Sequence, residues 1–151
     1  MIRLTPLVYK SGYKYQAEKD CVFQLPFAPE TAWDGEWIRF TTDGILTALS
    51  GYAWDGPSGP TIDTPDFMAG SLVHDCLYQL MGLGVLDPGK FRQLADEILA
   101  EVCKEDGMPA IRRAWVYAGV RVGGARPARA GDTILTIGLV PSGGKARIQK
   151  S

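Results

Sequence analysis

The sequence has few of the groups on which most catalytic sites depend. Histidine occurs once, at His74, and cysteine occurs three times among 151 residues. A single histidine excludes hydrolases whose metal ions need several histidine ligands, and the chain has no HExxH zinc pattern, P-loop, GxGxxG or GxSxG elbow. Any site therefore combines one histidine with carboxylates and backbone carbonyls, which suit a hard cation such as calcium.

Cysteines and long apolar runs are equally sparse. Cys21, Cys76 and Cys103 are odd in number and far apart, so they indicate neither a disulfide framework nor a CxxC zinc site. No run approaches the roughly 18 to 20 apolar residues that span a bilayer, and the first residues, MIRLTPLVYKSGYKYQ, lack the apolar core of a signal peptide. We expect a chain in a reducing compartment, with no transmembrane segment and no secretory signal.

Basic and acidic residues nearly balance over the whole chain but not at its end. The formal net charge is −1, so no specific nucleic-acid partner is expected. The end of the chain carries a single acid, Asp132, against eight basic residues: Arg112, Arg113, Arg121, Arg126, Arg129, Lys145, Arg147 and Lys150. This asymmetry indicates either a docking surface for an acidic partner, nucleic acid or lipid headgroups, or a solvated basic end, which we favour.

Strand-like patterns followed by helix-like patterns along the sequence predict an α+β fold in a single domain, residues 1–151. Short β-branched and aromatic runs indicate an N-terminal antiparallel β region over residues 1–60, with a hairpin at Asp43-Gly44. Residues 61–124 read as a three-helix unit, and residues 125–151 as a basic, partly flexible segment with one candidate strand, TILTIGLV.

Capping signals place the three helices. The first is predicted from Pro65 to Met81 with Thr64 as N-cap, and the second begins at Asp87-Pro88 and ends at Gly107. The third follows Met108-Pro109 and reaches Gly123-Gly124. Its apolar residues are expected to face inward: Ile111, Ala114, Trp115, Ala118 and Val122.

The candidate site lies on the first helix, in SLVHDCLYQL. His74 and Tyr78 share a face, whereas Asp75 is rotated by about 100° and should diverge from His74 rather than form a hydrogen-bonded dyad with it. If the first two helices pack antiparallel, Asp96 faces His74 and orients its ring. The alternative for Asp96 is a surface pair with Arg92, one turn away.

Small residues and a rigid loop surround this helix. Gly70 and Ser71 are expected to leave room beside the imidazole. The preceding stretch, GYAWDGPSGPTIDTPD, is rich in glycine, proline and acids, so its carbonyls could point at an ion, although it could also be a structural turn that leads into the helix. Exposed apolar residues nearby, with Trp54 and Met81 as candidates, would favour a lipid substrate.

The stretch GYAWDGPSGPTIDTPDFMAGSLVHDCLYQLM, followed by FRQLAD and KEDGMPAIRRAWVYAGVR, resembles a family of bacteriophage and prophage proteins of uncharacterised function. The resemblance covers residues 45–124 and rests on the GYxWDGxSGP and HDxLY patterns. It implies a phage origin in a tail or lysis gene region. The expected location is the host cytoplasm or the virion, and a homo-oligomer is left open.

A more distant resemblance concerns chemistry. The glycine loop, the HDxxY helix and an acid on the next helix are similar to calcium-dependent phospholipases that cut the sn-2 ester, and the parvovirus-capsid type is nearest. The resemblance implies that His74 is the general base, that Asp96 orients its ring and that Tyr78 supports Asp96. It also implies a calcium ion bound by Asp75 and the 55–59 loop, with Asp55, Gly56 and Gly59 as loop ligands.

Two functions follow from these expectations. One is a phage-encoded hydrolase, associated with the tail, the virion or lysis, that cuts esters of membrane phospholipid with the help of calcium. The other is a non-catalytic virion or tail-assembly component, bound to other phage structural proteins, in which the same residues form a buried polar network. The first requires access to His74, and the second requires that His74 is covered and both ring nitrogens are bonded.

Overall fold

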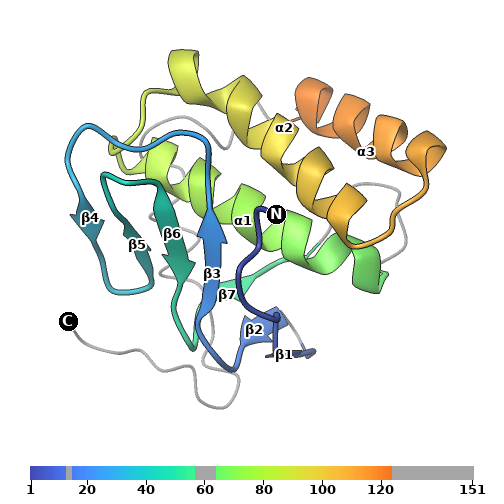
Figure 1. Cartoon of the computed structure of the whole chain (residues 1–151), viewed down its shortest axis with the longest axis horizontal. Helices are drawn as coiled ribbons and strands as arrows, with labels where there is room; N and C mark the ends of the chain where they lie inside the picture. The colour runs from blue at the N-terminus through green and yellow to red at the C-terminus, as the bar shows by residue number, and fades with distance from the viewer. Residues whose placement is uncertain (13–14, 57–63, 124–151) are drawn as a thin grey trace. The chain divides into compact units, whose positions relative to one another are not determined.

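The computed structural model describes residues 1–12, 15–56 and 64–123. Within these residues an N-terminal part made of short antiparallel strands is followed by three helices (Figure 1), which confirms the predicted α+β fold. The contacts within the chain divide it into two compact units, with a boundary between Asp55 and Gly56. The candidate strand TILTIGLV and the basic segment 125–151 lie outside the described residues.

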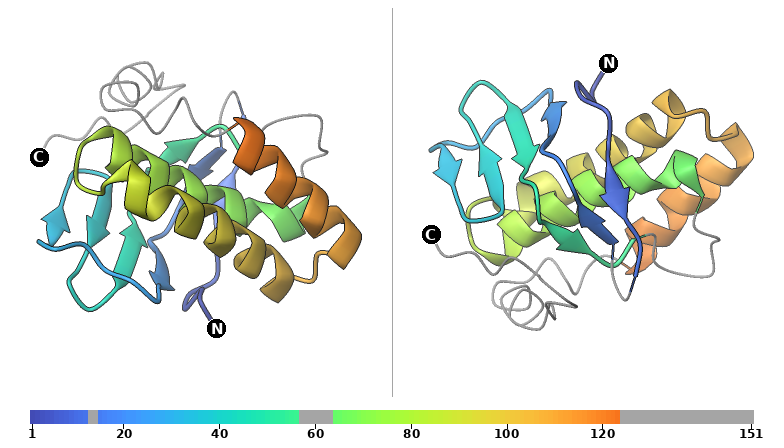
Figure 2. Two further views of the ribbon diagram at one scale, coloured as in Figure 1. Left: turned by 90° about the horizontal axis from the view of Figure 1, so that it is seen from above. Right: turned by 90° about the horizontal axis from the view of Figure 1, so that it is seen from below.

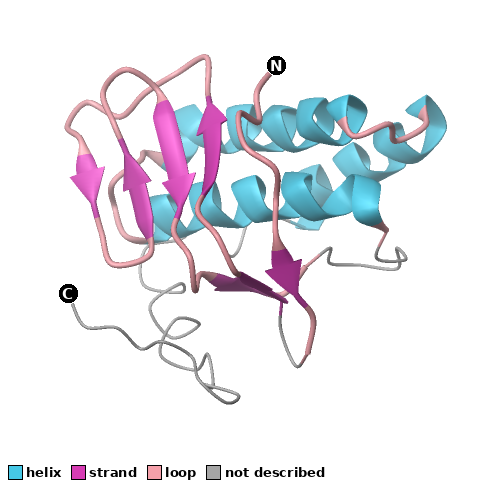
Figure 3. Cartoon of the chain, turned by 60° about the horizontal axis from the view of Figure 1, so that its bottom comes forward, coloured by secondary structure: helices cyan, strands magenta, loops and turns pink. Residues whose placement is uncertain are grey.

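The first unit contains two antiparallel sheets. The larger one has the strand order β3-β6-β5-β4, and the smaller one has the order β1-β2-β7 (Figure 3). The strands are β1 (Tyr9–Lys10), β2 (Tyr15–Ala17), β3 (Cys21–Gln24), β4 (Trp33–Asp34), β5 (Ile38–Phe40), β6 (Ile45–Ala48) and β7 (Ala53–Trp54). The predicted run ILTALSGYAW is thus split between the two sheets, because a turn through Gly51, at φ 100°, redirects the chain.

Side-chain alternation explains the larger sheet. Residues of β3, β5 and β6 are buried at every second position, so that one face carries the apolar side chains, among them Phe23, Phe40 and Leu46. The predicted hairpin joins β5 to β6, with Gly44 at φ 88° in its turn. A side chain at Gly44 would also meet the Leu25 carbonyl, so glycine is required there on two counts.

The second unit consists of α1 (Pro65–Gly82), α2 (Pro88–Glu105) and α3 (Ala110–Gly123). Figure 1 shows α2 lying between the other two helices, and Figure 2 shows the same three helices from above and from below. Thr64 and Asp87 stand at the predicted N-cap positions, followed by the two prolines, although neither side chain caps a backbone amide. None of the three helices is long and apolar enough to cross a membrane.

Helices α1 and α2 approach closely at Gly70. A Cβ atom built there would lie 2.7 Å from the Cys103 sulfur and 3.1 Å from the Leu99 carbonyl oxygen. The sequence suggested that Gly70 leaves room beside the imidazole, and this prediction is wrong. The space beside Gly70 is occupied by α2. The missing side chain allows α2 to come near enough for polar side chains to meet across the helix pair.

A small apolar core closes the unit beside this contact. It comprises Phe67, Leu99, Cys103, Met108 and Val116, with Val120 packed against it. Burial raises the pKa of the Cys103 thiol to about 12, so the thiol stays protonated and packs as an apolar group. All three cysteines are buried, and none of them forms a disulfide.

The close approach can be tested by Gly70→Ala. The added methyl group meets a sulfur and a backbone carbonyl, so the free energy of unfolding should fall by about 1–3 kcal/mol in denaturant titrations. Gly119→Ala on α3 is the matched control, because nothing lies within 4 Å of a Cβ built there. It should raise stability by up to about 1 kcal/mol through helix propensity. Equal effects of the two changes would contradict the tight contact.

Candidate functional site

The site is centred on the carboxylate of Asp96, which is 0% exposed. Its Oδ1 atom accepts a hydrogen bond from the Tyr78 hydroxyl at 2.8 Å and lies 2.7 Å from Nε2 of His74. Its Oδ2 atom accepts from Nη1 of Arg121 at 2.8 Å. One carboxylate on α2 is thus bonded by two side chains of α1 and one of α3, so all three helices converge on it.

Helical spacing positions the two α1 partners. His74 and Tyr78 are four residues apart, and their rings stack with centroids 4.1 Å apart and an interplanar angle of 33°. Both therefore point at the same neighbour on α2. The predicted antiparallel packing and the predicted contacts of Asp96 with His74 and Tyr78 are present. Because Asp96 is buried, the alternative of an exposed pair with Arg92 is wrong, and Arg92 donates instead to the Arg121 carbonyl at 2.6 Å.

Charge explains why the buried acid is tolerated. Burial alone would raise the pKa of Asp96, but hydrogen bonds from His74 and Tyr78 and the guanidinium of Arg121 outweigh it and lower the pKa below its ordinary value. Asp96 is therefore a carboxylate and accepts all three hydrogen bonds. Burial, together with the neighbouring Asp96 charge, raises the pKa of Tyr78, so the phenol stays a donor.

The bond to Asp96 determines the tautomer of His74. Since an ionised carboxylate only accepts, Nε2 carries the hydrogen, and in the neutral ring Nδ1 has a free lone pair. Nδ1 lies 3.9 Å from Oδ1 of Asp75, which is too long for a hydrogen bond but close enough for attraction between charges. Burial lowers the pKa of His74, but Asp75 and Asp96 more than compensate, and the net shift is upward.

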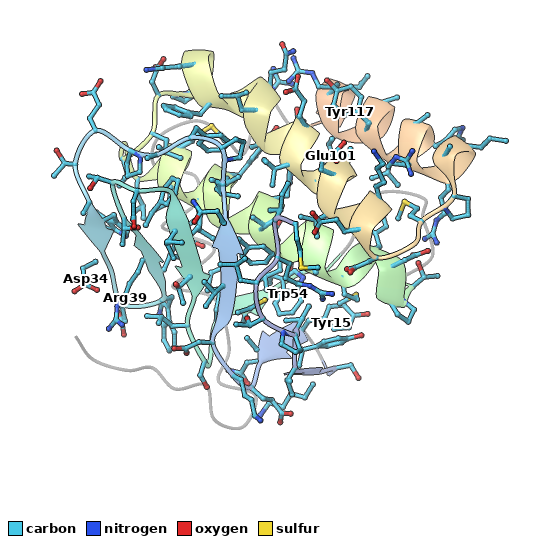
Figure 4. All side chains as sticks on the ribbon, viewed as in Figure 1. Tyr15, Asp34, Arg39, Trp54, Glu101 and Tyr117 are labelled. Carbon is cyan, nitrogen blue, oxygen red and sulfur yellow. The ribbon has the colours of Figure 1, made fainter. Side chains whose placement is uncertain are left out.

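Among the described residues, little of the His74 side chain is accessible to solvent. His74 is buried at 8% exposure, whereas the Asp75 side chain beside Nδ1 is 36% exposed. The expectation that Asp75 does not form a hydrogen-bonded dyad with His74 agrees with the 3.9 Å separation. The prediction that Trp54 and Met81 are exposed apolar residues near the site is wrong, because both are buried. Trp54 packs with Tyr9 and Tyr15 (Figure 4).

The predicted calcium ligands come from both units, and one of them lies outside the described residues. The described residues contain no group of three or more histidine, cysteine and acidic side chains that could hold a metal ion. Calcium also takes backbone carbonyls and water, so a single carboxylate such as Asp75 is compatible with it. Asp55 ends the first unit, Gly56 begins the second at φ 81°, and Gly59 lies outside the described residues. Their role as calcium ligands stays a prediction.

Arg121 is a site residue that the sequence did not reveal. The third helix was expected to face inward with Ile111, Trp115 and Val122, but these three side chains are exposed, and Val116 is the buried one. The helix is rotated so that two of its arginines reach acids on the other two helices. Arg121 bonds Asp96, and Arg112 bonds Thr64 and Asp66 near the start of α1. The signal that could have found Arg121 is the need of a buried carboxylate for a cationic partner.

Comparison of the chain with protein-family models, curated proteins and solved structures finds no match.

The central role of Asp96 predicts a large effect of Asp96→Asn. The neutral amide cannot accept from all three donors, so the free energy of unfolding should fall by about 1–3 kcal/mol in denaturant titrations. Asp34→Asn is the matched control, because Asp34 bonds Arg39 at 2.7 Å in an exposed pair, labelled in Figure 4. It should change stability by less than about 1 kcal/mol. Similar losses in both variants would argue against a buried hub.

The single histidine allows its pKa to be measured without ambiguity. An NMR titration should give a pKa for His74 above 6.5, and Asp75→Asn should lower it. Glu101→Gln, at an exposed position on α2 (Figure 4), should not. Because the folded pKa is raised, the stability contributed by His74 is complete below pH 6.5 and is lost as pH rises through the folded pKa. A pKa below 6.5 would show that burial, not the carboxylates, dominates.

Proposed function

We propose that the protein hydrolyses an ester bond of membrane phospholipid, with His74 as the general base. The observation that supports this most is the hydrogen bond from Nε2 of His74 to the buried Asp96 carboxylate, 2.7 Å long. It holds the ring in one orientation and leaves the lone pair on Nδ1, beside the partly exposed Asp75. This is the arrangement that a base needs in order to take a proton from water.

In the proposed reaction, Nδ1 of His74 accepts a proton from water while the water oxygen attacks the ester carbonyl carbon. The tetrahedral intermediate then collapses with cleavage of the carbon–oxygen bond, and the imidazolium returns its proton to the departing alkoxide. The products are a fatty acid and a lysophospholipid. Asp96 stabilises the transient imidazolium, and Tyr78 and Arg121 keep Asp96 in place.

A calcium ion bound at Asp75 would supply polarisation of the ester carbonyl and stabilisation of the oxyanion. The carboxylate of Asp75 is partly exposed and lies on the Nδ1 side of the ring, which is the side where the water would react. The expected phage origin and the phospholipase resemblance agree with this proposal. An enzyme of this kind would act when a phage crosses or leaves an envelope.

A second candidate function is a structural one. The low exposure of His74 and the full hydrogen bonding of Asp96 also suit a buried polar network in a virion or tail-assembly protein. Such a protein would depend on the same residues for stability and would release no product.

Fatty-acid release from mixed phospholipid vesicles tests the proposal. Wild type should release fatty acid with calcium and not with chelator, and the rate should rise with pH through the raised pKa of His74, because the base acts in its neutral form. His74→Gln should lower the rate by about 10²–10⁴-fold, and Asp75→Asn should remove the calcium response. Asp34→Asn is the control and should behave as wild type.

Two results together would contradict the proposal. If folded wild type releases no fatty acid with calcium, and calcium does not raise its melting temperature, the site neither catalyses nor binds the ion. A lower melting temperature of His74→Gln would then identify the structural function.

A further inference from the structure

The three helices of the second unit are buried to very different degrees. In α1, 15 of 18 residues are buried, and in α2, 7 of 18 are buried. In α3, one residue of 14 is buried, Val116, and the partly buried Val120 packs against the same apolar core. Because buried apolar surface provides most of the stability of a packed helix, α3 is held more weakly than its two neighbours.

Polar contacts hold the two ends of α3. Near its start, Nη1 of Arg112 donates to Oδ1 of Asp66 at 3.2 Å. Near its end, Nη1 of Arg121 donates to Oδ2 of Asp96 at 2.8 Å. Arg92 of α2 donates to the Arg121 carbonyl, one of the last four carbonyls, which have no partner within the helix. These bonds position α3, but water can replace each of them once the helix moves away.

The connection before α3 allows this helix to separate from the other two. Residues 106–109 join it to α2, and Gly107, at φ 92°, interrupts the helical path. Met108 stays in the apolar core, so the connection remains anchored when α3 leaves. An isolated helix of this length is marginal in water, so α3 loses its own backbone hydrogen bonds when it separates.

We propose that α3 opens as a separate cooperative unit while α1 and α2 stay packed, and that its docking completes the Asp96 site. In the open state, Oδ1 of Asp96 keeps its two partners on α1, whereas Oδ2 exchanges the guanidinium of Arg121 for water. The charge is then hydrated rather than left unpaired in an apolar interior. The opening therefore avoids the cost of an unpaired buried carboxylate.

The opening concerns the same residues in either candidate function, because both depend on Asp96 being held by all three helices. Its effect on catalysis rests on the proposed function: the docked state holds Asp96 against His74 and is the active one. The opening itself does not depend on hydrolysis. Hydrogen exchange needs no substrate, so the two proposals can fail separately.

Native-state hydrogen exchange of the full chain, followed by NMR in low denaturant, tests the opening. The interior amides of α3 should share one free energy of opening and exchange about 100-fold or more faster than the most protected amides of α1. Equal protection of the two helices would overturn the proposal, because α3 would then open only with the whole unit. Exchange that becomes steadily faster toward Gly123 would also overturn it, because that pattern indicates fraying of the helix end.

Arg112→Gln tests the contact at the start of α3, away from Asp96. It should speed the exchange of α3 by about tenfold through loss of a charged hydrogen bond and leave the interior of α1 unchanged. Arg39→Gln is the matched control, because Arg39 bonds Asp34 at 2.7 Å in an exposed pair of the first unit, and it should leave α3 unchanged. Equal exchange of α3 in the two variants would contradict a helix held by its polar contacts.

A double-mutant cycle tests the coupling of α3 to the site. Arg121→Gln and Asp96→Asn should each speed the exchange of α3 by about tenfold or more. Together they should do no more than the larger single change, because both remove the same contact. Arg112 lies about 13 Å from Arg121 along the helix, so Arg112→Gln and Asp96→Asn should multiply their effects. Multiplied effects of Arg121→Gln and Asp96→Asn would instead show that Asp96 does not hold α3.

Discussion

The second unit is organised around a carboxylate that has no contact with water. Asp96 must be fully bonded within the protein, because an unpaired buried carboxylate would cost far more than the few kcal/mol that keep a domain folded. Each helix contributes to the solution: α2 provides the acid, α1 provides His74 and Tyr78, and α3 provides Arg121. The orientation of the imidazole and the rotation of α3 both follow from this one requirement.

The complete hydrogen bonding of Asp96 suits both candidate functions, the structural network and the hydrolase. A buried network that is fully bonded rigidifies a helical unit and selects one packing arrangement. Yet the bonding is one-sided at His74, since Nε2 is committed to Asp96 whereas Nδ1 lies beyond hydrogen-bond distance from Asp75. Rigidity on one side of a ring and a free lone pair on the other are what a general base needs. A structural network has no need of the second feature.

Local patterns were enough to predict much of this from sequence. The order of strands and helices, the N-terminal residues of α1 and α2, and the contact of His74 with Asp96 follow from spacing and from the short connection between α1 and α2. The contact of Tyr78 with Asp96 was implied by the phospholipase resemblance. These features depend on interactions within a helix or between neighbours in the chain, which periodicity describes well.

The errors arose where a buried charge or a close contact overrides periodicity. The apolar residues of α3 were expected inside, but Asp66 on α1 and the buried Asp96 on α2 bond two of its arginines, and the large apolar side chains of α3 other than Val116 and Val120 are exposed. Gly70 was expected to open space, but the pattern of one helix cannot show that Cys103 of another fills it. Trp54 was a candidate lipid contact, yet its partners, Tyr9 and Tyr15, come from strands far away in sequence.

The central claim is that Asp96 fixes the tautomer of His74 and leaves Nδ1 as the base. Nitrogen-15 chemical shifts of the single imidazole, recorded above its pKa, measure this directly. The account predicts a protonated Nε2 and an unprotonated Nδ1, with Asp96→Asn producing a mixture of tautomers. A ring protonated at Nδ1 in the wild type would contradict it, because the lone pair would then face Asp96 and no base would be available on the side of Asp75.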